Sequence, residues 1–181
     1  MELVLIAAVS DNNVIGLDGQ VPWHIAEDMK RFKELTLHHP VIMGRKTYES
    51  IPLTFRPLSQ RQNIVLSTQL DYHPPGVLVM SSLEEAFDVV RRGEPAMNGI
   101  DYTAAFVIGG ESVYRKAMTL ADRMEITQVH QNVDGDAYFP AIDHTIWKEK
   151  KREDHNGYSF VTYTKRVKCS NISPFGIYQN A

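Results

Sequence analysis

The sequence predicts an α/β protein built on a twisted, mostly parallel sheet with helices packed against it. The first observation is a set of short, continuously apolar runs, which are typical of strands buried on both faces of a sheet. These runs occupy residues 3–9, 41–43, 63–66, 77–80 and 104–108. The second observation is that helical patterns lie between several runs, as crossovers between parallel strands require. The third is a hairpin signal at residues 155–157, which predicts an antiparallel edge formed by segments 147–153 and 158–167.

Four segments predict helices, and one alternating segment predicts a further strand. The helices are expected at residues 25–37, 47–50, 82–90 and 112–120, and the strand at residues 123–131. Ser82 and Glu85 form a capping-box pattern at the start of the third helix. Residues 10–24 instead predict a long irregular loop, because Gly16, Gly19 and several turn-forming residues interrupt any period. Long ordered loops of this kind are often lids or binding loops.

Composition restricts the class of protein and of partner. At 181 residues the chain predicts one domain, expected at residues 1–168, followed by a tail at 169–181 with no clear period. A net charge of −3 leaves no basic surplus for a nucleic acid. The apolar run at residues 3–9 is too short for a membrane span and wrongly flanked for a signal peptide. Cys169 is the only cysteine, so no intramolecular disulfide can form. We therefore expect a cytoplasmic monomer without membrane or nucleic-acid partners.

The helix predicted at residues 25–37 carries one residue that conflicts with its own pattern. At about 100° per residue, four apolar side chains fall on one arc. They are Ile25, Met29, Phe32 and Leu35, and the charged side chains opposite are Glu27, Lys30, Arg31 and Glu34. Asp28 projects inside the apolar arc, where an unpaired carboxylate is costly. Such conflicts are tolerated mainly at functional sites, so Asp28 is the first candidate for chemistry, with Trp23 as its expected neighbour. The alternative is that Asp28 forms a structural salt bridge or cap.

Two strand-to-helix turns carry a pattern suited to phosphate. They are Gly44-Arg45-Lys46-Thr47 and Gly109-Gly110-Glu111-Ser112. Each offers backbone N–H groups at a helix start, and a parallel sheet places both at the edge where ligands bind. Two adjacent turns suit a diphosphate, and Arg45-Lys46 near Ser67-Thr68 suits a further phosphate. Taken singly, either turn can also be a tight turn without a ligand. The chain has no G-x-G-x-x-G or Walker pattern and no metal-ligand spacing.

Seven stretches, in the same order along the chain, resemble the bacterial-type dihydrofolate reductase family. They are LIAAVSDNNVIG at 5–16, VPWHIAEDMKRFKELT at 21–36, PVIMGRKTYESI at 40–51, NIVLST at 63–68, FVIGGESVY at 106–114, EITQV at 125–129 and DGDAYFP at 134–140. The resemblance implies a three-layer fold with an eight-stranded, mostly parallel sheet, an antiparallel C-terminal strand and four flanking helices. It also implies hydride transfer from NADPH to C6 of 7,8-dihydrofolate and protonation of N5, which yields tetrahydrofolate for one-carbon metabolism. Antifolate inhibitors are further ligands expected from the resemblance.

By this resemblance, Asp28 is the pocket acid that accepts hydrogen bonds from N3 and the 2-amino group of the pterin and favours protonation at N5. Thr127 supports the acid, and Trp23 completes the catalytic set. Arg61 pairs with the α-carboxylate of the glutamate tail. The walls around the p-aminobenzoyl group are Phe32, Ile51 and Leu58, and the other substrate residues are Ile6, Ala8, Met29, Ile108 and Tyr114.

The same resemblance implies a cofactor site and its lid. The residues for the diphosphate, 2′-phosphate and adenosine are Gly44, Arg45, Lys46, Thr47, Leu66, Ser67, Thr68, Ser81, Gly109, Gly110, Glu111, Ser112, Val113 and Tyr114. The residues for the nicotinamide side are Ala8, Ile15, Gly16, Gly19, Gln20 and Ile108. Residues 10–24 form the lid that excludes water, Gly135-Asp136 brace it, and the Gly109-Gly110 peptide is cis.

Some positions depart from the family pattern. Val21 replaces a methionine that is usual in some bacterial lids, and Ser112 stands where an arginine sometimes contacts the cofactor. The loop at residues 52–60 is longer than the common form, which leaves the role of Arg56 open. Two other functions fit part of the sequence. A riboflavin-pathway reductase shares the fold and cofactor but does not need the Trp23 and Asp28 pair, and a non-catalytic NADPH-binding module needs the turns but no buried acid.

Overall fold

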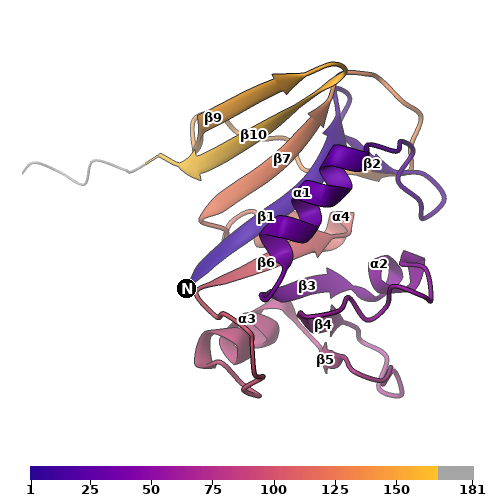
Figure 1. Cartoon of the computed structure of the whole chain (residues 1–181), viewed down its shortest axis with the longest axis vertical. Coiled ribbons are helices and arrows are strands. Elements are labelled where there is room, and N and C mark those ends of the chain that lie inside the picture. The colour runs from indigo at the N-terminus through magenta and orange to yellow at the C-terminus, as the bar shows by residue number, and fades with distance from the viewer. Residues whose placement is uncertain (167–181) are drawn as a thin grey trace, which may run out of the picture.

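The computed structural model describes residues 1–166 as an eight-stranded sheet with four helices (Figure 1). The strand order is β5-β4-β3-β6-β1-β7-β10-β9. The strands are β1 (Glu2–Ser10), β3 (Pro40–Gly44), β4 (Gln62–Leu66), β5 (Leu78–Met80), β6 (Ala104–Gly109), β7 (Arg123–Val129), β9 (Trp147–His155) and β10 (Tyr158–Lys165). The helices are α1 (Ala26–Thr36), α2 (Arg45–Ser50), α3 (Leu83–Arg92) and α4 (Glu111–Ala117). The expected tail at 169–181, with Cys169, lies outside the described residues.

The strands from β5 to β7 pair in parallel, and the closing hairpin pairs antiparallel, which confirms the predicted fold class. Strand β1 lies between β6 and β7, with Leu5 opposite both Val107 and Met124. Strand β10 returns along β7, with Thr162 opposite Glu125. Because the parallel strands share one direction, their carboxyl ends meet at one edge of the sheet, the usual place for a ligand in such folds.

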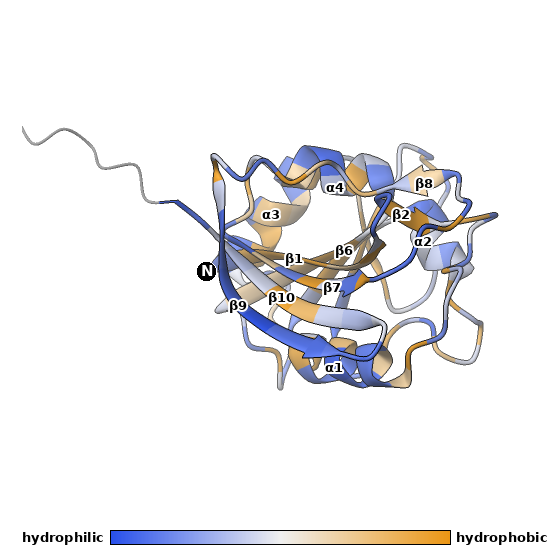
Figure 2. Cartoon of the chain, turned by 90° about the horizontal axis from the view of Figure 1, so that it is seen from above, coloured by the Kyte–Doolittle hydropathy of each residue, from blue (hydrophilic) through white to orange (hydrophobic). Residues whose placement is uncertain are grey.

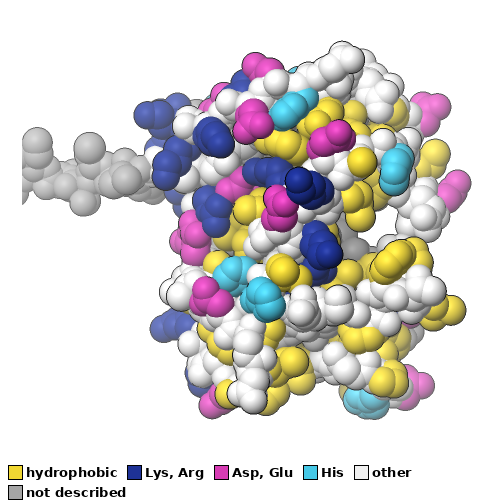
Figure 3. Space-filling model, in the orientation of Figure 1, with side chains coloured by type: hydrophobic (Ala, Val, Ile, Leu, Met, Phe, Trp, Pro, Cys, Tyr) yellow, Lys and Arg dark blue, Asp and Glu magenta, His cyan; other side chains and the backbone are white. Residues whose placement is uncertain are grey.

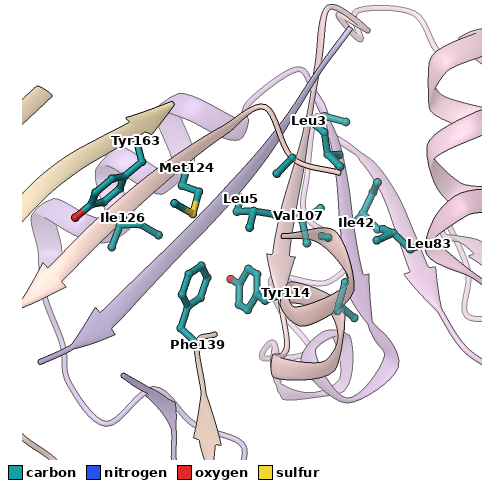
Figure 4. Close-up of a cluster of buried hydrophobic side chains, with 14 of the residues drawn as sticks. Leu3, Leu5, Ile42, Leu83, Val107, Tyr114, Met124, Ile126, Phe139 and Tyr163 are labelled. Atoms are coloured by element: carbon teal, nitrogen blue, oxygen red, sulfur yellow. The ribbon is translucent and has the colours of Figure 1, made fainter. Parts of the chain in front are cut away.

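The central strands are continuously apolar because helices cover both faces of the sheet. In β1, Leu3 and Leu5 belong to the cluster packed by α3 and α4, which Figure 4 shows in close-up. Val4 and Ile6, on the opposite face, belong to the cluster packed by α1 and α2. Seen from above, α3 and α4 lie on one side of the sheet and α1 on the other (Figure 2). The strand pattern in the sequence therefore reflects a three-layer architecture.

Helix α1 begins and ends within one residue of the prediction, but two of its side chains do not lie where the pattern places them. Met29, expected on the buried face, is 58% exposed. Arg31, expected on the polar face, turns toward the sheet and donates to the buried carboxylate of Glu125 on β7. The physical reason is that Glu125 on the sheet attracts the Arg31 guanidinium inward. The hydropathy pattern of the helix alone cannot reveal a partner on another element.

The segment at residues 10–24 is not wholly irregular, which corrects the prediction of a continuous loop. Residues Val14–Gly16 form β2, which pairs antiparallel with β8 (Ala137–Tyr138) as a separate two-stranded sheet. Each strand is too short to show a period of its own. Their pairing joins parts of the chain that are distant in sequence, so no local pattern could reveal it.

Helix ends follow the predicted chemistry with small differences. The Ser82 hydroxyl accepts from the backbone N–H of Glu85 at 3.1 Å, as a capping box requires. The Glu85 carboxylate, however, accepts from the N–H and hydroxyl of Ser81 rather than closing the box on Ser82. Helix α4 ends at Ala117 and not at residue 120, because the carbonyl of Ala117 accepts from Leu120 and Ala121 in a tightened turn.

Candidate active site

Asp28 lies in the first turn of α1 and reaches the sheet through one hydrogen bond. The Thr127 hydroxyl on β7 donates to Asp28 Oδ1 at 2.6 Å, which is the support that the resemblance implies. Burial raises the pKa of the Asp28 carboxyl, while the Thr127 hydrogen bond and the charge of Arg31 act in the opposite direction. Because this bond uses Oδ1, the second carboxylate oxygen can accept from a ligand. Asp28 is thus a half-buried acid with capacity for a further partner.

Trp23 precedes α1 and presents a donor without a protein acceptor. Its indole Nε1 is buried and has no hydrogen-bond partner among the described residues. A buried donor of this kind is normally satisfied by water or a ligand. Trp23 therefore suits a site that is completed by a bound molecule.

The two glycine turns lie side by side at the carboxyl edge of the sheet, as predicted. Met43 on β3 pairs with Gly109 on β6, and the Gly109-Gly110 peptide is cis, as the resemblance implies. A Cβ on Gly110 would lie 3.1 Å from the hydroxyl oxygen of Thr47, and a Cβ on Gly44 would lie 3.3 Å from a methyl of Val113. Each turn thus packs against the other at positions where a larger residue would not fit without movement.

The polar and charged side chains near these turns differ in whether they already have a partner within the protein. Arg45 is bonded to Glu49 at 2.8 Å, whereas Lys46 is exposed. Strands β3 and β4 pair Gly44 with Leu66, so Ser67 and Thr68 follow directly beside the first turn. The Glu85 carboxylate binds Ser81, and the Glu111 carboxylate binds Arg115 and the N–H of Tyr138. The side chains of Ser81 and Glu111, both predicted cofactor residues, therefore already have protein partners.

Tyr114 joins the second turn to the central strand. Its hydroxyl donates to the carbonyl of Ile6 at 2.6 Å, and its ring packs against Gly109. Burial raises the pKa of the Tyr114 hydroxyl strongly, so it remains a neutral donor. Tyr114 on α4 thus links Ile6 on β1 to Gly109, which follows Ile108 at the end of β6.

The lid segment is held by the segment predicted to brace it. The N–H of Asp136 donates to the carbonyl of Gly16 at 3.0 Å, and the N–H of Asp18 donates to the Asp136 carboxylate at 3.1 Å. A Cβ on Gly135 would lie only 2.2 Å from a methyl of Val14, so the two segments are in close contact. Ile15 lies within β2, and Gln20 closes a turn onto Leu17 through two backbone hydrogen bonds.

Arg61 directly precedes β4 and lies beside Phe32 of α1. It is 8% exposed, its guanidinium lies 5.7 Å from the centre of the Phe32 ring, and Nε has no partner among the described residues. Burial lowers the pKa of Arg61, and a buried cation of this kind favours an anionic partner. Ile51 and Leu58 pack with Phe32 against the same apolar cluster. This arrangement brings together a cation and an apolar wall, as the resemblance implies.

Asn63 is a residue whose role the sequence did not reveal. Its side-chain amide accepts from the N–H of Leu58 at 2.9 Å and donates to the carbonyls of Leu58 and Arg61. Asn63 therefore clamps the loop that carries Leu58 and Arg61. Arg56, whose role was open, donates to the carbonyl of Glu49 at 2.9 Å. The missed signal is a buried pair of polar residues, Gln62 and Asn63, at the start of an otherwise apolar strand.

The surface is hollowed on the side where the lid segment and α2 face each other, with hydrophobic side chains at its margins (Figure 3). We call this hollow the cleft. Within residues 1–166, no group of three or more His, Cys, Asp or Glu side chains could hold a metal ion. In the same range, no helix is both long and apolar enough to cross a membrane.

Fold and site together define a class of protein: an α/β protein with a half-buried acid and paired glycine turns near the carboxyl edge of a parallel sheet. The chain belongs to the dihydrofolate reductase family, since the family model described as dihydrofolate reductase matches residues 2–166. This finding confirms the resemblance seen in the sequence.

Individual relatives agree with the family. The chain is 43% identical over 171 residues to a dihydrofolate reductase of Neisseria meningitidis serogroup A, covering 91% of this chain and 99% of that protein. It is 41% identical over 167 residues to dihydrofolate reductase HdrB of Haloferax volcanii, covering 92% of this chain and 84% of that protein. A solved structure of dihydrofolate reductase from Enterococcus faecalis, complexed with NADP(H) and RAB-propyl, is similar with a TM-score of 0.76 at 32% identity. That similarity covers 91% of this chain and 96% of the other.

Proposed function

We propose that the protein reduces 7,8-dihydrofolate to 5,6,7,8-tetrahydrofolate with NADPH. The observation that carries this proposal is the half-buried carboxylate of Asp28, held at 2.6 Å by the Thr127 hydroxyl. A flat heterocycle with two adjacent N–H donors satisfies such a carboxylate through a bidentate contact. The dihydrofolate reductase names of the relatives support the same substrate.

On the substrate side, the pterin binds Asp28 through N3 and its 2-amino group. The p-aminobenzoyl group packs against Phe32, Ile51 and Leu58, which form a partly buried apolar wall. The α-carboxylate of the glutamate tail pairs with Arg61, whose buried Nε supports an anionic partner. Because Asp28 binds the pterin and Arg61 binds the glutamate tail, these two residues set the direction in which the substrate lies.

Asp28 promotes the reaction by favouring the protonated pterin. A carboxylate beside the ring stabilises positive charge at N5, and protonated N5 makes C6 a better hydride acceptor. The hydride then bonds to C6 while the proton, delivered through water, stays on N5. The lid segment, held by Asp136, keeps bulk water away from the reacting atoms.

The paired turns fit a dinucleotide with phosphate groups. Gly44 and Gly110 allow the two turns to pack together, because a Cβ at either position would meet Val113 or Thr47. The main-chain N–H groups at the starts of α2 and α4 are the proposed phosphate donors. Lys46, exposed beside the first turn, supplies charge for a further phosphate. NADPH bound here supplies the hydride. Ala8, Ile15 and Ile108 are the residues proposed for its nicotinamide end.

We also propose that residues 1–168 form the catalytic domain, which the family match over residues 2–166 supports. The tail at 169–181 is proposed to lie outside the catalytic unit. We place the activity in the cytoplasm, where NADPH is available and where a chain with the single cysteine Cys169 needs no disulfide.

The test is an assay of the purified full chain with NADPH, followed by the absorbance of the reduced nicotinamide. We expect oxidation to begin only when dihydrofolate is added and to consume one NADPH for each dihydrofolate. Failure to oxidise NADPH under these conditions would contradict the proposal. Tight NADPH binding without turnover of any pterin would indicate a binding module, and turnover of a riboflavin-pathway pyrimidine in place of dihydrofolate would indicate the other reductase.

A further inference from the structure

We propose that the ion pair between Arg31 on α1 and Glu125 on β7 positions the catalytic acid. The pair fixes the rotation and height of α1 on the sheet, and so sets where the Asp28 carboxylate lies relative to β7. This inference deepens the proposed function and rests on it. Arg31 and Glu125 are positioning residues, because they act through Asp28 and not on the substrate.

Glu125 is a fixed anchor on the sheet and not a mobile surface charge. Its side chain is 4% exposed and accepts hydrogen bonds from Arg31, from Arg123 and, at 2.9 Å, from the Thr162 hydroxyl. Arg123 is itself held by Glu2 at 3.0 Å. A buried carboxylate persists only when it is paired and hydrogen-bonded in this way. Any group that bonds to Glu125 is therefore tied to a rigid point.

Arg31 is confined from a second direction. Its guanidinium lies 4.7 Å from the centre of the Phe160 ring on β10, and its side chain is 19% exposed. A guanidinium over an aromatic face gains a cation–π attraction. Strand β7 therefore supplies the carboxylate and β10 supplies the aromatic face, so both groups that hold the Arg31 guanidinium belong to the sheet.

Two side chains of α1 are bonded to two side chains of β7. Glu125 and Thr127 are two residues apart on a strand, so they point to the same face of the sheet. Asp28 and Arg31 are three residues apart on a helix, so they lie on the same side of α1. Thr127 bonds Asp28, and Glu125 bonds Arg31. A helix held at one point can pivot about it, whereas two bonds one turn apart fix its orientation.

The charged and titratable groups around Asp28 come from four elements. They are Glu27 and Arg31 on α1, Arg123 and Glu125 on β7, Tyr114 on α4 and Tyr158 on β10. Burial raises the pKa of Asp28, and the Thr127 hydrogen bond and the Arg31 charge oppose that rise. Loss of Arg31 therefore raises the pKa of Asp28 further, and it also raises the pKa of a pterin nitrogen bound beside it.

The experiment compares Arg31→Met in the full chain with two matched controls. Lys30→Met removes the same charge from the same helix, at a side chain that is 78% exposed. Lys33→Met removes a second positive charge from α1, at another exposed position. Arg31→Lys tests rescue by a conservative change. The double variant Arg31→Met with Glu125→Gln leaves no unpaired buried carboxylate, and it replaces the single variant if that variant does not fold.

For Arg31→Met we expect KM for dihydrofolate to rise about tenfold, with KM for NADPH changed by less than about twofold. The pH midpoint of hydride transfer is expected to move upward, because a positive charge beside the protonated site is lost. Both controls should keep the wild-type values of KM and pH midpoint, and Arg31→Lys should recover most of the loss.

A measurement that needs neither substrate nor cofactor separates this inference from the proposed function. The carboxyl carbon resonance of Asp28 in NMR, assigned from its absence in Asp28→Asn, should titrate at higher pH in Arg31→Met than in Lys30→Met. A wild-type chain that fails to reduce dihydrofolate overturns the proposed function. An Asp28 titration that is the same in Arg31→Met and in both controls overturns the positioning role.

Discussion

The Thr127 hydroxyl donates a 2.6 Å hydrogen bond to Asp28 Oδ1 and so joins β7 to the first turn of α1. The two residues are 99 positions apart in the sequence. Because the hydroxyl comes from a central strand, the sheet sets the orientation of the acid, and α1 alone does not. The candidate chemistry therefore depends on how a helix near the amino terminus docks on a strand near the carboxyl terminus.

Replacing the hydroxyl tests this dependence. Thr127→Val keeps the shape of the side chain but removes the donor, and a hydrogen bond to a charged group is worth about 1.5–3 kcal/mol. We expect kcat/KM for dihydrofolate to fall by roughly 10- to 150-fold in steady-state assays. Thr127→Ser retains the donor and should stay close to wild type. A loss in Thr127→Ser together with wild-type activity in Thr127→Val would show that packing of the methyl group, and not the hydrogen bond, matters.

Arg61→Met tests the proposed contact with the glutamate tail. The buried guanidinium has an Nε without a partner among the described residues, so a carboxylate partner should be lost together with it. We expect KM for dihydrofolate to rise by about 10- to 150-fold, the size of a charged hydrogen-bond contact, with kcat little changed. A reduced pterin that lacks the glutamate tail is the control substrate, and its KM should not respond. A similar loss on both substrates would assign Arg61 to the stability of the fold.

Gly135→Ala tests the contact between the lid and its brace. The added Cβ would lie 2.2 Å from a methyl of Val14 and 2.8 Å from the carbonyl oxygen of Gly16, so the segments must separate. Overpacking of this kind costs about 1–3 kcal/mol, and we expect hydride transfer to slow by roughly 5- to 150-fold in stopped-flow measurements. The neighbouring Asp134→Ala, at an exposed position, is the control. Unchanged transfer in Gly135→Ala would mean that the lid does not need its brace.

The burial of Asp28 also predicts how stability depends on pH. Because burial raises the pKa of this carboxyl above its unfolded value, the folded state holds the proton more tightly than the unfolded chain. The stabilising contribution is complete below the ordinary aspartate pKa and is lost as the pH rises through the raised value. In the protein without ligands, Asp28→Asn should therefore have a higher Tm than wild type at neutral pH. That advantage should disappear in acid, and a Tm difference independent of pH would contradict this linkage.

The sequence predicts most of the sheet because burial on two faces leaves a local signature. Strands such as β1 and β6 are continuously apolar, and any such run can be recognised without its neighbours. Asp28 is recognisable for a related reason, since it breaks the apolar pattern of its own helix. The signal in both cases lies within a few residues of chain.

What the sequence did not reveal depends on partners that are distant in the chain. The short strands β2 and β8 form only because they pair with each other. The sequence pattern places Arg31 on a solvated face, whereas its partner Glu125 lies on a strand of the sheet. The pattern places Asn63 in a strand but does not reveal its bonds to Leu58 and Arg61. Side-chain pairs between separate elements have no period, so they become visible only in the folded structure.

The central claim is that the carboxylate of Asp28 favours a protonated pterin for hydride transfer. The most direct measurement is the single-turnover rate of hydride transfer in Asp28→Asn and in wild type, each preloaded with NADPH, from neutral to acidic pH. We predict that the variant loses most of its rate at neutral pH and recovers part of it in acid, where dihydrofolate is protonated before it binds. A variant with the wild-type rate at neutral pH would contradict the account.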